Sequence, residues 1–203
     1  MATTRDVASL AVGVGLAFIL WYGVFLTGIL GSFWLRVTLA AAALALYASV
    51  VGGADPRGGL KLDMTALAKG AVSGVLLYAL FALGFSAFRP LVEHGAAAVY
   101  LLRGDSPILA ASALIATSIC EEYFWRLYVQ RTLVTRNGRA GLALSTLAYA
   151  SIHLPTLNAS LVLAALAAGL YWGLLYQRTG SFGVVAASHI AWTELVFVFL
   201  PLG

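Results

Sequence analysis

The sequence predicts an all-α protein, a polytopic transmembrane helix bundle of about seven spans, with six to eight compatible with the pattern. Of its 203 residues, 62% are hydrophobic and only 10% are charged, whereas soluble domains carry about 25% charged residues. Several uncharged stretches approach the length of a membrane-crossing helix, which needs about 20 predominantly apolar residues. We therefore expect a multi-pass protein of the cell membrane whose first partner is the lipid bilayer.

The expected spans follow one another along the chain and are separated by short polar or glycine-containing loops. They cover residues 7–30, 33–51, 70–88, 108–134, 142–153, 161–176 and 184–202. The first is longer than the apolar core of a signal peptide, about 7–15 residues, so we expect it to be retained. The fifth and sixth are short, and Pro155 between them excludes one continuous helix. An eighth span or a re-entrant element therefore stays open.

Two connecting segments have a composition of their own. Residues 52–59 contain four glycines and a proline and are expected to form a loop. Residues 90–103 mix charged with apolar side chains, which is typical of a helix lying at the membrane interface. Pro107 then opens the fourth span, at a position of the first helical turn that favours proline.

The basic residues of the loops predict the orientation of the chain. With seven spans, the N-terminal side collects eight of them and the opposite side three: Arg5, Arg57, Lys61, Lys69, Arg131, Arg136, Arg139 and Arg178 against Arg36, Arg89 and Arg103. Because Lys and Arg accumulate in cytoplasmic loops, we expect a cytoplasmic N-terminus. The same residues form no run and no patch with interleaved aromatics, so the sequence excludes nucleic acid as a partner.

The unusual stretch is Cys120-Glu121-Glu122-Tyr123-Phe124-Trp125-Arg126, which places three charges inside the fourth span. Each charged side chain costs about 2.5–3.5 kcal/mol at the centre of a membrane helix. The ionisable groups expected at membrane depth are Glu121, Glu122, Arg126, His153, His189 and Glu194. Their concentration in so apolar a chain favours a functional cluster.

The spacing of these groups suggests activation of a water molecule. Side chains four apart share a helix face, so Glu122 and Arg126 can pair, while Glu121 points about 100° away. Burial disfavours the charged form of a carboxyl group, which makes a buried carboxylate a useful general base near neutral pH. We therefore predict that Glu121 is the base, with His153 and His189 as its partners, and that Glu122 has a structural role.

The last span adds a second predicted element of the site. His189 and Thr193 are four residues apart and share one helix face. Hydrogen-bond donors on that face would stabilise the oxyanion that forms when water adds to a peptide carbonyl. His153, which comes just ahead of Pro155, is suited to share a proton or to position the water.

Other interpretations of the same residues stay open. Glu122 and Arg126 alone would also fit a structural ion pair. Two histidines and a glutamate form a known catalytic zinc set, so if a divalent metal such as zinc is bound, its ligands would be Glu121, His153 and His189. No His-Glu-x-x-His helix occurs, and the spacing does not decide between metal and metal-free activation. The single cysteine, Cys120, excludes a Cys-based zinc site and is interpreted as a packing residue.

These motifs resemble the CPBP family of intramembrane proteases, the Abi and CAAX-protease group that includes Rce1-like proteins. The family pattern is Glu-Glu-x-x-x-Arg, then an aromatic residue-x-x-x-His, then His-x-x-x-Asn or Asp, on successive membrane helices. The chain supplies Glu121-Glu122-Tyr123-Phe124-Trp125-Arg126, then Tyr149-Ala150-Ser151-Ile152-His153, then His189-Ile190-Ala191-Trp192-Thr193. The resemblance covers residues 108–202. Tyr149 stands in place of the usual Phe, and Thr193 stands where the family has Asn or Asp.

The resemblance implies an intramembrane endopeptidase that cleaves near the C-terminus or a membrane-adjacent part of a protein or lipidated-peptide substrate. It implies that Glu121 and His153 activate the water and that His189 and Thr193 form the oxyanion hole. We accordingly divide the chain into N-terminal membrane helices with an interfacial segment, 1–106, and a catalytic helical core, 107–203. The alternatives are an Abi-like immunity or scaffolding protein without catalysis, and a proton-coupled transporter, since Glu and His chains also relay protons.

Overall fold

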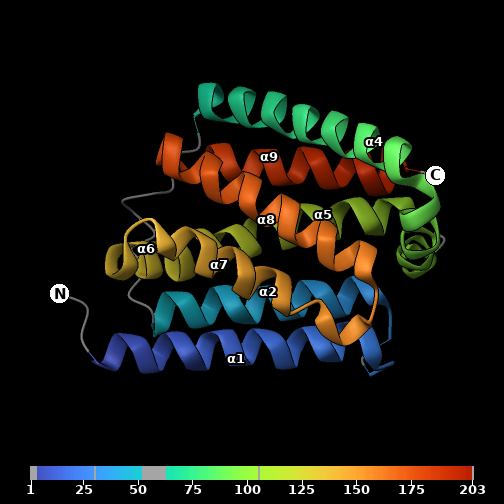
Figure 1. Cartoon of the computed structure of the whole chain (residues 1–203). Coiled ribbons are helices and arrows are strands. Elements are labelled where there is room, and N and C mark those ends of the chain that lie inside the picture. The colour runs from blue at the N-terminus through green and yellow to red at the C-terminus, as the bar shows by residue number, and fades with distance from the viewer. Residues whose placement is uncertain (1–3, 30, 52–62, 105, 203) are drawn as a thin grey trace.

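The computed structural model describes residues 4–29, 31–51, 63–104 and 106–202, and the regular elements within these ranges are all helical. This confirms the predicted all-α fold (Figure 1). The elements are α1 (Thr4–Leu26), α2 (Phe33–Val50), α4 (Met64–Tyr100), η1 (Leu101–Arg103), α5 (Pro107–Glu122), η2 (Tyr123–Gln130), α6 (Arg131–Asn137), α7 (Ala140–Ser151), η3 (Leu154–Thr156), α8 (Ala159–Thr179), α9 (Phe182–Glu194) and η4 (Leu195–Phe199).

Among the described residues, six helical segments are long and apolar enough to cross a membrane. They correspond to six of the seven predicted spans, so the polytopic bundle is confirmed. The exception is the predicted span 142–153. Its helix, α7, has 12 residues and is about 18 Å long at 1.5 Å per residue, whereas the hydrocarbon core is about 30 Å thick. A short 3₁₀ turn that contains Pro155 follows it, which stops the helix from continuing.

The predicted interfacial helix 90–103 corresponds to the part of α4 that follows a kink, together with η1, and its position at the membrane interface stays a prediction. Helix α4 continues through Pro90 to Tyr100, with a break in the helical backbone at Phe88 (φ −114°, ψ 19°). Proline inside a helix removes a hydrogen bond and clashes with the preceding turn, which explains the kink at this point. Figure 1 shows the bend at the end of α4 that lies near the C-terminus of the chain.

Part of the predicted topology lies outside the described residues. This applies to the loop 52–59 and to the loop charges Arg57 and Lys61. The cytoplasmic position of the N-terminus therefore stays a prediction.

Helix α5 lies at the centre of the bundle. It packs against α2 on one side and against α9 on the other, while α1 covers α2, α4 covers α9 and α7 packs on α8. Figure 1 shows this order, with α1 and α2 at one edge of the molecule and α4 at the opposite edge. The central position of α5 explains why both glutamates in its last turn are buried.

Two glycines allow α4 to lie directly against α9. A Cβ atom at Gly70 would lie 2.5 Å from the carbonyl oxygen of Val184, and one at Gly74 would lie 2.6 Å from that of Ser188. The two glycines are four residues apart, the spacing by which small residues allow membrane helices to approach closely. Because α9 carries His189, this contact also positions one wall of the candidate site.

We predict that Gly74→Ala lowers the free energy of unfolding by about 1–3 kcal/mol, since the added methyl group overpacks the contact between α4 and α9. Gly84→Ala on the same helix is the matched control, because no atom lies within 4 Å of its added Cβ. The control should be neutral or more stable by up to about 1 kcal/mol, since alanine favours the helix. Denaturant titration of the purified full chain in detergent micelles measures both values, and equal stability of the two variants would contradict the prediction.

Candidate active site

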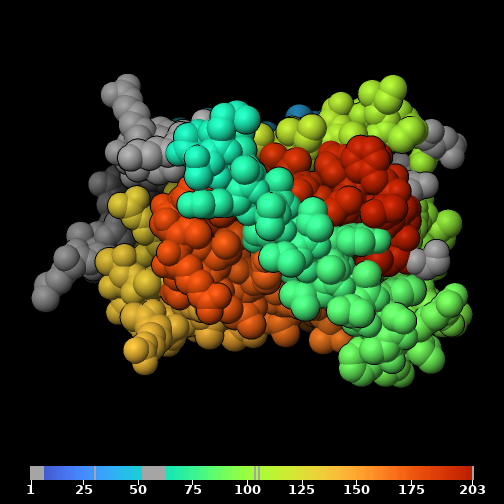
Figure 2. Space-filling model, turned by 90° about the horizontal axis from the view of Figure 1, so that it is seen from above, coloured from blue at the N-terminus to red at the C-terminus, as the bar shows by residue number. Residues whose placement is uncertain are grey.

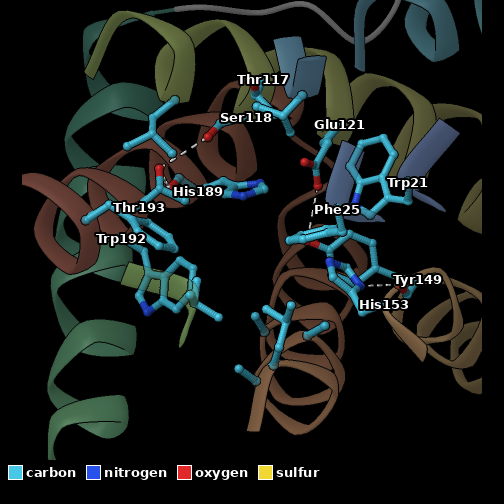
Figure 3. Close-up of a pocket in the computed structure, with 18 of the residues that line it drawn as sticks. Trp21, Phe25, Thr117, Ser118, Glu121, Tyr149, His153, His189, Trp192 and Thr193 are labelled. Atoms are coloured by element: carbon cyan, nitrogen blue, oxygen red, sulfur yellow. Dashed lines mark hydrogen bonds between the residues drawn. The ribbon is translucent and has the colours of Figure 1, made fainter. Parts of the chain in front are cut away.

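A cavity of about 130 Å³ lies inside the bundle, between α1, α2, α5, α7, α8 and α9. Its polar lining residues are Thr117, Ser118, Glu121, Tyr149, His153, His189 and Thr193 (Figure 3). One water molecule occupies about 30 Å³ in the liquid, so the cavity has room for several. The structure thus brings four of the six predicted site residues, from three separate parts of the sequence, to one cavity.

The two glutamates stand where an α-helix changes into a π-helix. Helix α5 ends at Glu122 and η2 continues directly as a π-helix over Tyr123–Gln130. At the end of η2 the backbone N–H of Arg131 donates to the carbonyl of Arg126, five residues back. Such wide turns are rare and are often found at functional sites.

Glu122 is fully buried and both of its carboxylate oxygens have partners. Arg126 Nε donates to Oε2 at 2.8 Å, and His189 Nδ1 lies 2.9 Å from Oε1. The side chains of Glu122 and Arg126 are both 0% exposed. Glu122 does not line the cavity. This carboxylate therefore holds Arg126 and His189 in place and does not face the cavity.

Glu121, in contrast, lines the cavity and points into it (Figure 3). Its Oε2 accepts a hydrogen bond of 3.1 Å from the hydroxyl of Tyr149 on α7. The sequence predicted His153 and His189 as its partners, but His189 binds Glu122 instead. The tyrosine contact was missed, although a buried tyrosine in place of phenylalanine signals a hydroxyl that needs a partner.

We predict that Tyr149→Phe lowers kcat/KM about tenfold and leaves the fold intact. A hydrogen bond to a charged group contributes about 1.5–3 kcal/mol, part of which water in the cavity can replace when the hydroxyl is removed. The rate of peptide cleavage in proteoliposomes measures the effect. Tyr47→Phe is a control, because its hydroxyl donates to the carbonyl of Ser9 and neither residue lines the cavity. Equal activity of both variants would show that Tyr149 does not act on Glu121.

His153 follows α7 and is held by its own backbone. Its Nδ1 lies 3.2 Å from the carbonyl oxygen of Tyr149. A carbonyl can only accept, so Nδ1 carries the proton, and in the neutral ring Nε2 keeps a free lone pair. The ring also contacts Phe25 of α1, with 6.0 Å between centroids. The structure therefore presents His153 as a fixed acceptor in the wall of the cavity that Glu121 also lines.

His189 and Thr193 form the opposite wall, on α9. The imidazole of His189 is stacked on the indole of Trp172, with ring centroids 3.8 Å apart and 24° between the planes. The Thr193 hydroxyl donates to the carbonyl of His189 at 2.9 Å and lies 3.3 Å from Ser118 Oγ. The single hydroxyl proton of Thr193 is used within α9. Ser118 is therefore the donor in the Ser118–Thr193 hydrogen bond.

Comparison with known protein families identifies the segment of the chain that carries these residues. Residues 103–194 match the family model described as type II CAAX prenyl endopeptidase Rce1-like. The chain carries an Rce1-like domain. Its Rce1-like segment contains every predicted site residue, and the predicted resemblance is confirmed. The matched family is described as CAAX prenyl endopeptidases, which are proteases, so this segment of the chain is similar to an enzyme family of hydrolases. No curated protein and no solved structure matches the chain.

The Rce1-like segment does not supply the donor set of a metal site in this arrangement. Among the described residues, no group of three or more His, Cys, Asp or Glu side chains is placed to hold a metal ion. The three ligands that the sequence suggested, Glu121, His153 and His189, are therefore not brought together as a metal site in this arrangement.

Two residues that the sequence singled out lie outside the cavity of the Rce1-like segment. Neither Cys120 nor Glu194 is among its lining residues. Cys120 is partly buried against the hydrophobic core, in keeping with a packing residue. Within the described part of the chain, the buried Oε1 of Glu194 has no hydrogen-bond partner. The structure assigns neither of them to the Rce1-like site.

An apolar groove of about 670 Å³ adjoins the cavity. It lies between α4, α8 and η4, and Figure 2 shows α4 crossing over α8 and α9 on this face of the molecule. The groove and the cavity share five wall residues: Val99, Leu161, Ala164, Trp192 and Phe197. The Rce1-like site thus has an apolar approach from the side of the bundle that α4 covers.

Proposed function

We propose that this protein is an intramembrane endopeptidase in which Glu121 activates water to hydrolyse a peptide bond of a protein or lipidated-peptide substrate. The observation that carries the proposal is the separation of the two glutamates. Glu122 is closed off by Arg126 and His189, whereas Glu121 is the only carboxylate among the described residues that line the cavity. A base that takes a proton from water must reach that water, and Glu121 does.

The proposed reaction uses the groups around the cavity in two steps. Glu121 removes a proton from a water molecule that is also hydrogen-bonded to Nε2 of His153, and the water oxygen attacks the peptide carbonyl carbon. The carbonyl π electrons move to its oxygen, and donors on the opposite wall stabilise the resulting oxyanion. When the oxyanion collapses, the C–N bond breaks and the leaving amine takes the proton from the Glu121 carboxyl group.

Two donors are available for the oxyanion in this proposal. The first is Nε2–H of His189 when the ring carries both protons, because Nδ1–H is already directed to Glu122. The second is the Ser118 hydroxyl, which can turn from Thr193 toward the cavity that it lines. Thr193 then positions Ser118 in place of acting as a donor itself, which accounts for a threonine at the position where the family has Asn or Asp.

The apolar groove supports a substrate with a large apolar part. A lipid chain or an apolar segment of the substrate that lies between α4 and α8 would pass Trp192 and Phe197 and bring the adjoining peptide to Glu121. Burial of apolar surface contributes about 25 cal/mol per Å², so such a groove would supply much of the binding free energy. This matches the substrate class in the family description, a prenylated peptide.

The experiment that tests the function follows cleavage of a farnesylated CAAX peptide by the purified full chain in proteoliposomes, with mass spectrometry of the products. We predict that His153→Ala lowers kcat/KM about 10²–10⁴-fold, the range that positioned acid–base groups contribute. His94→Ala is the matched control, because this third histidine is exposed and lines neither the cavity nor the groove.

Equal rates for the wild type and His153→Ala would contradict the proposed mechanism. If the wild type does not cleave this probe, mass mapping of membrane-protein C-termini from cells with and without the chain would reveal another substrate. No altered C-terminus in that comparison would favour the non-catalytic, Abi-like role.

A further inference from the structure

A closed chain of contacts surrounds the buried side of His189. Arg126 binds Glu122 at 2.8 Å, and its Nη1 lies 3.4 Å from Oε1 of Gln130. Gln130 Nε2 donates to the carbonyl of Gly173 at 2.9 Å. The preceding residue, Trp172, stacks on His189, and His189 returns to Glu122 at 2.9 Å. We call this closed chain the support ring; its members are Glu122, Arg126, Gln130, Gly173, Trp172 and His189.

The sequence spacing explains how one helix supplies half of the support ring. Glu122, Arg126 and Gln130 succeed one another at intervals of four residues along the end of α5 and through η2. They therefore follow one face of the helix, which is directed toward α8 and α9. Gln130 is 1% exposed, so its amide is committed to these two contacts.

Helix α8 is shaped to receive this amide. A Cβ atom on Gly173 would lie 3.2 Å from Gln130 Oε1 and 2.6 Å from Leu142 Cδ1. The absence of a side chain at Gly173 thus lets Gln130 reach the backbone of α8. A hydrogen bond to the carbonyl of Gly173 fixes that turn of α8 and hence the direction from which the indole of Trp172 meets His189.

Two contacts in perpendicular directions fix the orientation of the His189 imidazole. Glu122 holds Nδ1 within the plane of the ring, and Trp172 lies parallel to its face. A rotation of the ring would break both contacts at once. The support ring ties the two contacts together, because Glu122 is held by Arg126 and Trp172 is held through Gln130 and Gly173.

We propose that Gln130 and Trp172 are positioning residues that hold the imidazole of His189 so that Nε2 faces the cavity. Neither contributes a reacting atom. The support ring acts as a unit, so the loss of either Gln130 or Trp172 should free the imidazole of His189 to rotate. The catalytic part of this inference rests on the proposed function, whereas the fixed orientation of His189 does not depend on it.

The orientation of His189 is measured without any substrate. The chain has three histidines, so the full chain labelled with ¹³C,¹⁵N-histidine in lipid nanodiscs gives few signals, and the spectrum of His189→Gln identifies the one from His189. Stacking on an indole at 3.8 Å displaces the ring C–H signals upfield. Trp172→Leu and Gln130→Met should each remove most of this displacement, and Trp172→Phe should keep a large part of it.

The second measurement is cleavage of the farnesylated CAAX peptide by the same variants. Side chains that orient a catalytic group typically contribute about 10–100-fold to activity, so Trp172→Leu and Gln130→Met should each lower kcat by this factor. KM should change little in Gln130→Met, whereas Trp172 also lines the cavity, so its replacement is expected to change KM as well. Because both act through one imidazole, the double variant should lose much less than the product of the two factors. Phe124→Leu is the control for a buried aromatic residue, since Phe124 is 0% exposed and lies outside the cavity.

The outcomes separate this inference from the proposed function. Unchanged His189 signals in both Trp172→Leu and Gln130→Met overturn the inference, whatever the activity. Changed signals with kcat equal to that of an active wild type overturn the catalytic part. If the wild type itself cleaves nothing, the proposed function fails, and the spectra alone decide whether Gln130 and Trp172 hold His189.

Discussion

Glu121→Gln is expected to lower kcat/KM about 10²–10⁴-fold or more, while the protein keeps its fold and stability. The amide has the same shape as the carboxylate, and its oxygen can still accept the hydrogen bond from Tyr149. It cannot take a proton from water, so the general base is lost. Cleavage of a farnesylated CAAX peptide in proteoliposomes measures the loss, and thermal unfolding in detergent shows whether the fold is retained.

The neighbouring glutamate is the matched control for this prediction. Glu122→Gln removes the charge that faces Arg126 and His189 at 2.8 and 2.9 Å, so its first effect should be on stability. The two variants differ by one position and make the same chemical change. Normal cleavage by Glu121→Gln would eliminate this residue as the base, and an equal loss of stability in both variants would show that the two glutamates do not have separate roles.

Arg126→Met is expected to lower the free energy of unfolding by about 3–5 kcal/mol, because it leaves the fully buried carboxylate of Glu122 without its cationic partner. The double variant Glu122→Gln/Arg126→Met removes both charges and should regain part of that loss, since an apolar replacement of a buried pair is often tolerated. Unfolding of the purified chain in mixed micelles, followed by tryptophan fluorescence, measures all three proteins.

An exposed ion pair of the same kind provides the control for Arg126. Arg89 and Glu93 on α4 are also four residues apart, and Arg89 Nε lies 3.1 Å from Glu93 Oε2. Their side chains, however, are 63% and 43% exposed. Exposed pairs contribute about 0.2–1 kcal/mol, so Arg89→Met should change the stability by less than 1 kcal/mol. A similar loss in Arg89→Met and Arg126→Met would mean that burial does not decide the contribution of the pair.

The spans were predictable because hydropathy acts locally. A stretch of about 20 apolar residues needs no partner to be recognised, and six of the seven expected stretches are helices of spanning length. The failure at 142–153 has the same cause. The apolar stretch 142–153 looks like a span when only its hydropathy is considered. That its helix α7 has 12 residues, ends before Pro155 and packs on α8 becomes clear only from the rest of the bundle.

The candidate site was predictable to the extent that its contacts lie within one helix. The spacing of four between Glu122 and Arg126 defines their ion pair, and the same spacing continued to Gln130 would have indicated the next member of the support ring. Contacts between helices were not accessible in this way. Tyr149 to Glu121 and His189 to Glu122 span 28 and 67 residues, and their pairing depends on how α7 and α9 pack on α5.

Trp21 and Phe25 of α1 line the cavity, although both precede the Rce1-like match at residues 103–194. The cavity therefore extends beyond the part of the chain that matches the family. The matched segment, less than half of the chain, carries the candidate acid–base and hydrogen-bonding groups, and residues of the first two helices complete the walls of the cavity. A chimera that keeps residues 103–194 but takes its first helices from another protein would keep the chemistry and change which peptides enter.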